Sequence, residues 1–155
     1  MSVNLQNPSP SKLQSAIQTT RPPFLILAPV CVLLGLSLAY QAGYSFKLID
    51  LILIFAAALL AHASVNSLNE YIDFKSGLDL KTERTPFSGG SGALPNNPSA
   101  LKHALILGLV SLSLTALIGL YFVYSVGLIL LPLGIAGIAL VPCIHHGLID
   151  YHGYA

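Results

Sequence analysis

The chain is poor in charge. Only 8% of its 155 residues are Asp, Glu, Lys or Arg, against roughly a quarter in an ordinary soluble domain. Six acids and seven bases are too few to cover the surface of a soluble protein of this size, and 54% of the residues are hydrophobic. A net charge of +1 provides no basic surface for nucleic acid. The composition therefore predicts an integral membrane protein.

Several common chemical signatures are also missing. The two cysteines, Cys31 and Cys143, lie in apolar runs and provide no disulfide framework. The sequence contains no P-loop, no GxGxxG pattern and no pairing of a nucleophile with a base. These absences leave one polar segment, in the middle of the chain, as the place where chemistry is expected.

Four apolar stretches follow a polar lead-in that we expect to be flexible or interfacial. They run from about Phe24 to Tyr40, Leu48 to Val65, Ala104 to Val123 and Val126 to Ile144. Each approaches the ~20 residues that cross a bilayer, and only helices satisfy their own backbone in lipid at this length. The sequence predicts an all-α membrane protein with about four transmembrane helices in two antiparallel hairpins. Its expected parts are a polar segment at 1–23, a helical region at 24–144 and a tail at 145–155.

The Lys and Arg residues predict the orientation. Six of the seven lie before the first apolar stretch or between the second and the third, and only Lys47 lies on the other side. By the positive-inside rule, the N-terminus, the loop at 66–100 and the C-terminus are cytoplasmic, in a multi-pass protein of the cell membrane. A cleaved signal peptide is the less favoured alternative, because the apolar run and the lead-in are both long for one.

Nearly all the polar chemistry lies in residues 62–92. Four of the six acids fall between Glu70 and Glu83. No Gly or Pro precedes Gly77, so the second membrane helix is expected to continue past the membrane edge and to end there. At ~100° per residue this helix carries one polar stripe, made of His62, Asn66, Asn69 and Asp73. Because polar groups in lipid are costly, the stripe should face a bundle interior or a water-filled cavity.

Oxygen ligands and cations lie close together around the end of this helix. Two Asp side chains and an Asn amide suit a hard cation, and Mg²⁺ binds through one or two carboxylates plus substrate phosphates. The neighbouring Lys75, Lys81 and Arg84 suit phosphate oxygens. The small residues of Phe87–Gly92 let backbone N–H groups approach an anion. The alternative for such a charged run is a solvated interfacial loop.

Three segments resemble one known family. Residues 69–79, NEYIDFKSGLD, resemble the first aspartate-rich motif of the UbiA superfamily of intramembrane prenyltransferases, in the branch with the 1,4-dihydroxy-2-naphthoate prenyltransferases. Residues 21–35 resemble the start of that family's first helix, and residues 84–95 resemble the loop after the motif. The resemblance implies a helical bundle around a lipid-facing cavity. It also implies transfer of a polyprenyl group from a polyprenyl diphosphate to an aromatic or related acceptor, as in quinone biosynthesis.

The resemblance also implies roles for individual residues. The residues expected to hold Mg²⁺ are Asn69, Asp73, Asp79 and Glu70. At position 70 many members of the family have Asp. The residues expected to bind the diphosphate are Arg84, Lys81, Lys75 and Ser88. Catalysis is assigned to Asp73, Asn69 and Arg84, since metal and cation together would offset the charge that grows on the leaving diphosphate.

One departure from the family pattern is large. The family has a second aspartate-rich motif on a later loop, whereas the only acid after Glu83 here is Asp150. The chain therefore resembles the N-terminal half of a prenyltransferase. The alternative function is a truncated remnant, or a subunit of a split enzyme that is inactive alone. A complementary C-terminal half or a second copy of the chain would then be its partner.

Overall fold

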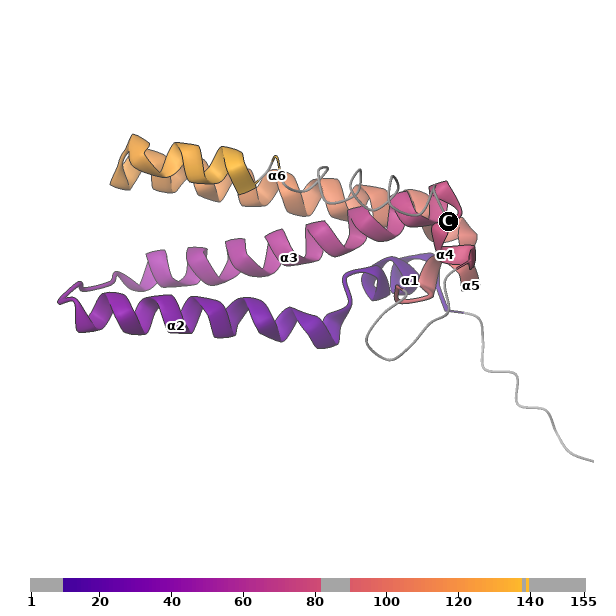
Figure 1. Ribbon diagram of the computed structural model, residues 1–155, viewed down its shortest axis with the longest axis horizontal. Helices are drawn as coiled ribbons and strands as arrows, with labels where there is room; N and C mark the ends of the chain where they lie inside the picture. The colour runs from indigo at the N-terminus through magenta and orange to yellow at the C-terminus, as the bar shows by residue number, and fades with distance from the viewer. Residues whose placement is uncertain (1–9, 82–89, 138, 140–155) are drawn as a thin grey trace, which may run out of the picture.

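The computed structural model describes residues 10–81, 90–137 and 139. Three long helices run side by side (Figure 1) and are α2 (Leu27–Gln41), α3 (Leu48–Ser76) and α6 (Leu101–Val126). Three short helices gather at one end of the bundle and are α1 (Lys12–Thr19), α4 (Leu78–Lys81) and α5 (Ala93–Asn96). Single 3₁₀ turns are η1 (Pro22–Ile26), η2 (Pro98–Ala100) and η3 (Leu128–Leu130).

Three helical segments are long and apolar enough to cross a membrane. They comprise Pro22–Gln41, Leu48–Ser76 and Pro98–Val126, each with a mean hydropathy of 2.2 or 2.3. Many of their Leu, Ile and Val side chains point outward, as lipid-facing residues do. Three of the four predicted spans and the all-α membrane fold are thereby confirmed. The fourth span is helical over Leu128–Gly137, and the rest of it lies outside the described residues.

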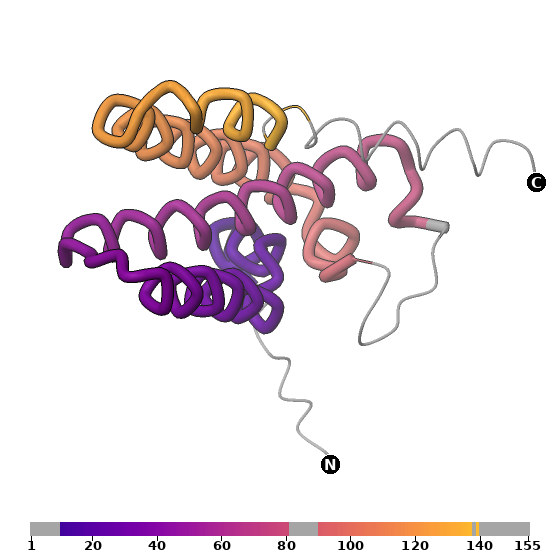
Figure 2. The backbone as a smooth tube through the Cα atoms, turned by 60° about the vertical axis from the view of Figure 1, so that its left-hand side comes forward, coloured from indigo at the N-terminus to yellow at the C-terminus, as the bar shows by residue number. Residues whose placement is uncertain are grey.

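Two tight connections place neighbouring helices antiparallel. The turn between α2 and α3 passes through Gly43, whose φ is +88°, and the turn after α6 passes through Gly127, whose φ is +133°. These positive φ values favour glycine because it lacks a Cβ atom. After the second turn, residues 128–137 run back along α6, as Figure 2 shows. This is the hairpin arrangement that the short links predict.

The contact between α3 and α6 depends on small side chains. Ser64 and Leu68 of α3 are buried, as are Gly108 and Ser111 of α6. A Cβ atom at Gly108 would lie only 2.8 Å from the Leu68 Cγ atom. Small residues let membrane helices approach closely, so the glycine is what permits this spacing.

Helix α3 ends as the sequence predicts. It continues without a break from the apolar stretch into the polar segment, and Gly77 follows its last residue with φ of +79°. A glycine in the left-handed conformation is a common helix stop. The chain then turns into α4, with the Leu80 N–H donating to the Gly77 carbonyl at 3.2 Å. This stop places Asp79 close to the end of α3.

The lead-in contains a helix that the sequence analysis did not predict. Helix α1 starts at the Ser11 side chain, which accepts from the Gln14 N–H at 3.2 Å. Its buried residues are Ser15, Ala16 and Thr19. Because this buried face is small and partly polar, the segment has no apolar run that would reveal a packed helix.

Candidate functional site

Five segments meet at the end of the bundle where α3 leaves the apolar region. These are α1 with the residues after it, the last three turns of α3, α4, the turn at residues 90–92 with α5, and the start of α6 (Figures 1 and 2). A small core of Leu94, Ala100 and Ala104 packs with Phe74 and Leu101 beneath them. We call this core the platform, and Glu70 on α3 and Asp79 on α4 lie at the same end of the bundle.

The predicted polar stripe forms, although α6 covers a different face of α3. The buried residues Ser64, Ser67 and Leu68 lie about 180° around the helix from the stripe, at ~100° per residue. Within the stripe, the Asn66 amide donates to the Thr20 carbonyl at 2.8 Å. Three other members stay half-buried and are His62, Asn69 and Asp73. The described helices therefore cover one edge of the stripe and leave its centre accessible.

Glu70 is the most completely enclosed acid in the described residues. Its side chain is 1% exposed, and Oε1 accepts from the Arg21 Nε atom at 3.1 Å. Oε1 also accepts from the backbone N–H of Ser91, and Oε2 accepts from the Ser91 hydroxyl. This carboxylate therefore joins α3 to the segment after α1 and to the glycine-rich turn.

Asp79 lies beside the same turn. Its residue is 6% exposed on α4, and a Cβ atom at Gly90 would lie 3.0 Å from Asp79 Oδ1. Gly90 and Gly92 both have positive φ, at +77° and +73°. A Cβ atom at that distance would crowd the carboxylate, and the positive φ values also favour glycine. The structure thus brings the predicted ligand Asp79 against Gly90, a residue of the predicted anion-binding loop.

Of the four residues predicted to bind the diphosphate, the structure describes the side chain of Lys75 only. The Lys75 ammonium lies 5.5 Å from the centre of the Tyr71 ring, a cation–π contact on the exposed side of α3. Lys81 ends α4, and its side chain lies outside the described residues, as do Arg84 and Ser88. The diphosphate-binding roles of these four residues stay predictions.

Most of the chain matches a known protein family. The model of the UbiA prenyltransferase family matches residues 28–155. The chain belongs to this family. Over 126 residues it is 34% identical to the 1,4-dihydroxy-2-naphthoate octaprenyltransferase of Bacillus subtilis, a match over 79% of this chain and 38% of that protein. Over 88 residues it is 36% identical to UbiA prenyltransferase domain-containing protein 1 of Dictyostelium discoideum, covering 55% of this chain and 27% of that protein.

The matched region includes α2, α3 and α6, so membership of the UbiA family applies to the whole membrane bundle. The chain spans about 38% and 27% of the lengths of these two relatives. No solved structure matches it.

Three oxygen-bearing side chains of the UbiA-type motif lie on α3 and α4. Asn69 and Asp73 lie one turn apart on the same face of α3, and Asp79 follows on α4. Within residues 10–81 and 90–137, no group of three or more His, Cys, Asp or Glu side chains is close enough to hold a metal ion. The chemistry of Asn69, Asp73 and Asp79 nevertheless fits Mg²⁺. This ion takes one or two protein carboxylates and completes its shell with water and phosphate oxygens.

Two residues of this site were missed from the sequence. Arg21 entered the prediction as an orientation charge and as part of a family segment, and Ser91 only as a small residue of the loop. The available signal was position, since Arg21 is the last charged residue before the first membrane span. An arginine at this position can pair with a buried acid, but the sequence does not show that Glu70 is that acid.

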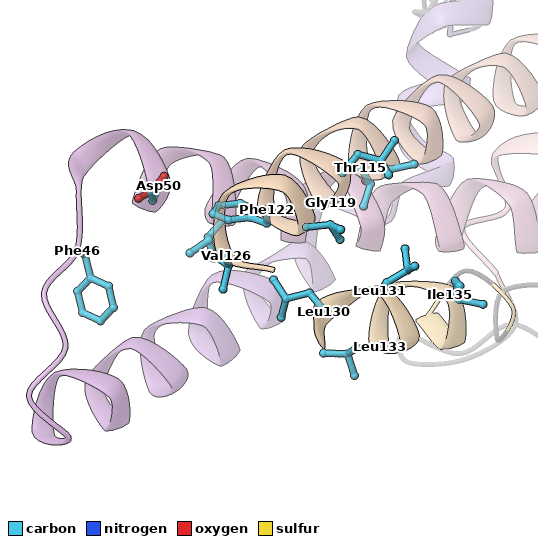
Figure 3. A pocket seen from close by; sticks show the side chains of 15 residues that line it. Phe46, Asp50, Thr115, Gly119, Phe122, Val126, Leu130, Leu131, Leu133 and Ile135 are labelled. Atoms are coloured by element: carbon cyan, nitrogen blue, oxygen red, sulfur yellow. The ribbon is translucent and has the colours of Figure 1, made fainter. Parts of the chain in front are cut away.

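A separate apolar groove lies at the other end of the bundle (Figure 3). Its volume is about 820 Å³. Its lining comes from the turn before α3, the start of α3, the second half of α6 and residues 130–135. It includes Phe46, Phe122, Val126 and Leu131. Asp50 at its edge accepts from the Tyr121 hydroxyl at 3.2 Å. Asp50 and Asp73 are 23 residues apart on one helix, which is about 35 Å, so the groove is distinct from the site around Glu70.

Proposed function

We propose that this chain provides the first aspartate-rich half of a Mg²⁺-dependent prenyltransferase site. The reaction transfers a polyprenyl group from a polyprenyl diphosphate to an aromatic or related acceptor. The relative from Bacillus subtilis is named for a reaction of this kind, which supports a place in quinone biosynthesis. The proposed location is the cell membrane, with the motif on the cytoplasmic side.

The observation that carries this proposal is the way α3 changes from apolar to polar along one helix. Its apolar part is long enough to span the lipid. Its polar part presents Asn69 and Asp73 on an accessible face, and Asp79 follows on the platform beyond Gly77. An enzyme that acts on a lipid diphosphate needs both environments next to each other, because the substrate has an apolar tail and a highly charged head.

The proposed division of roles follows from the chemistry of the side chains. Asn69, Asp73 and Asp79 would hold Mg²⁺, which when bound offsets the charge of the diphosphate as it leaves. Lys75 on α3, with Lys81, Arg84 and Ser88 after it, would bind the phosphate oxygens. The apolar surfaces of the membrane helices would hold the prenyl tail and keep water away from the reacting carbon.

The test is Mg²⁺-dependent binding of a fluorescent polyprenyl diphosphate to the purified chain in lipid nanodiscs. We expect tighter binding with Mg²⁺ than with EDTA, and we expect Asp73→Ala to remove most of the difference. Asp50→Asn is the matched control, because it removes a carboxylate from the same helix about 35 Å away. Equal binding with Mg²⁺ and with EDTA would count against the proposal.

A second candidate is a subunit that has no activity by itself. The accessible centre of the stripe supports it, because His62 and Asn69 remain half-buried after α1 and α6 have packed. Polar groups at membrane depth normally face other protein or a water-filled cavity. Helices from a complementary half or from another copy of the chain would cover them.

A further inference from the structure

The carboxylate of Glu70 makes three contacts with two separate segments. Oε1 accepts from Arg21 Nε at 3.1 Å and from the Ser91 N–H, while Oε2 accepts from the Ser91 hydroxyl. The side chain is 1% exposed. A buried carboxylate is tolerated when it is paired and hydrogen-bonded, and here both oxygens are engaged by the protein.

Arg21 makes its contact with Glu70 from a backbone conformation that non-glycine residues rarely adopt. Arg21 has a φ of +52°, the only positive φ of a non-glycine residue in the described part of the chain. That conformation is disfavoured for a side chain with a Cβ atom. It persists because hydrogen bonds fix both sides of the residue: its N–H donates to Gln18 O at 3.0 Å, and its carbonyl accepts from Phe24 N at 2.9 Å. This backbone conformation places the Arg21 guanidinium beside Glu70.

The other end of the contact holds the glycine-rich turn. Ser91 lies between Gly90 and Gly92, both with positive φ, and its hydroxyl also accepts from the Ala93 N–H at 3.1 Å. Gly90 in turn lies directly against the Asp79 carboxylate. The glycine-rich turn is thus attached to α3 at Ser91, next to Gly90, which lies against Asp79.

We propose that Arg21, Glu70 and Ser91 form a clasp that positions the glycine-rich turn against Asp79. Glu70 is then a positioning residue, in place of the metal-ligand role that the family resemblance suggests. The clasp rests on the proposed function, because it assigns Asp79 and the turn to the diphosphate site. It also gives the segment before the first membrane span a role in ordering that site.

Electrostatics favour the clasp over a ligand role. The Arg21 guanidinium beside Glu70 repels a divalent cation, and Mg²⁺ would have to displace two hydrogen bonds from Ser91 to reach the oxygens. Asn69, Asp73 and Asp79 are the remaining oxygen donors of the motif. The three remaining oxygen donors are enough for a cation that is completed by phosphate and water.

Hydrogen exchange of the whole chain in nanodiscs tests the clasp without any substrate. In Glu70→Ala and in Ser91→Ala, amides of residues 90–97 should exchange faster, on the order of tenfold for the loss of one charge-assisted hydrogen bond. Asp50→Asn is the control and should leave this peptide unchanged. Unchanged exchange of residues 90–97 in both clasp variants would overturn the proposal.

Mg²⁺ titration of polyprenyl diphosphate binding separates positioning from ligation. The clasp predicts that Glu70→Ala and Ser91→Ala weaken diphosphate binding several-fold while the Mg²⁺ midpoint stays as in the wild type. A higher Mg²⁺ midpoint in Glu70→Ala alone would establish a ligand and refute the clasp. If Glu70→Ala does not fold, Arg21→Gln replaces it in the exchange assay and Glu70→Gln replaces it in the Mg²⁺ titration. If the wild type does not bind the diphosphate at all, the proposed function fails, whereas the exchange experiment still decides whether the clasp exists.

Discussion

Gly108 and Leu68 show how a single missing methyl group sets the spacing of two membrane helices. The Leu68 side chain lies over the Gly108 Cα atom, and a Cβ atom there would be 2.8 Å from both Cγ and Cδ2 of Leu68. The Leu68 backbone N would be 3.4 Å away, which is an ordinary contact. The Leu68 side chain would therefore have to move, or α3 and α6 would have to separate.

We expect Gly108→Ala to destabilise the chain by roughly 1–3 kcal/mol, as overpacking of a close contact does. Gly119→Ala is the matched control, since it lies on the same helix and nothing lies within 4 Å of its Cβ position. Thermal unfolding in detergent, followed by helical circular dichroism, compares the two variants. A midpoint for Gly108→Ala equal to that of Gly119→Ala would show that the helices are not this close.

At the residue scale, the sequence singled out Asp79 and counted Gly90 among the small residues of the following loop, and the structure places these two residues together. The pairing of Arg21 with Glu70 joins positions 49 residues apart. Spacing along a single helix does not reveal such a contact, because it depends on how the segment before α2 folds back over α3.

Helix α1 has three different faces. Ser15, Ala16 and Thr19 pack on the protein, and the Thr19 hydroxyl donates to the Ser67 hydroxyl at 3.0 Å. Leu13 and Ile17 lie together on a second face and are 64% and 48% exposed. A third face, about 100° further round, carries Gln14 and Gln18. An apolar face turned outward just before a membrane span is suited to the boundary between lipid headgroups and acyl chains.

Tryptophan fluorescence measures whether α1 lies in this boundary, because the chain has no Trp of its own. We expect Ile17→Trp to be blue-shifted and strongly quenched by brominated lipids. Gln18→Trp is the matched control on the neighbouring face of the same helix, and it should be quenched less. Equal quenching at the two positions would show that α1 does not lie with its apolar face in the lipid.

At the element scale, the lengths of the apolar stretches and the positions of Gly and Pro predicted the long helices well. The apolar stretch, the absence of Gly and Pro before Gly77 and the glycine itself predicted the end of α3, which the structure confirms. Helix α1 was not predicted because it is short and polar on average and contains no long apolar run. Its helical period was present in the sequence, since Leu13 and Ile17 recur one turn apart.

The two ends of the bundle should lie on opposite sides of the membrane. α3 has 29 residues, about 43 Å at 1.5 Å per residue, which exceeds the ~30 Å hydrocarbon core. With Cys31 and Cys143 replaced by Ala, a single Cys at Ser99 should react only with reagent on the cytoplasmic side. A single Cys at Ser45, beside Lys47, should react only from the other side. Labelling of both from one side would rule out this topology.

The polar stripe on α3 is accessible from one face only, and this bears on the activity of the chain. α6 packs on the side of α3 opposite to it, so His62 and Asn69 are reached only from the face that the described helices leave accessible. The proposed ligands Asn69, Asp73 and Asp79 also approach a bound cation from one side. Within the part of the chain that the structure describes, a diphosphate held there would meet protein on one face only.

This one-sided geometry predicts that the purified 155-residue chain has no measurable prenyl transfer by itself. Each preorganised contact to the developing charge is worth roughly 10²–10³ in rate, so a site that lacks several of them should turn over near background. Co-expression with a C-terminal half that carries a second aspartate-rich motif should restore transfer, measured as radiolabelled prenyl product in membranes. The same C-terminal half with its motif aspartates changed to Ala is the control and should not restore it. A robust Mg²⁺-dependent rate from the 155-residue chain alone would contradict this prediction, and would mean that the first motif suffices or that copies of the chain complete one another's sites.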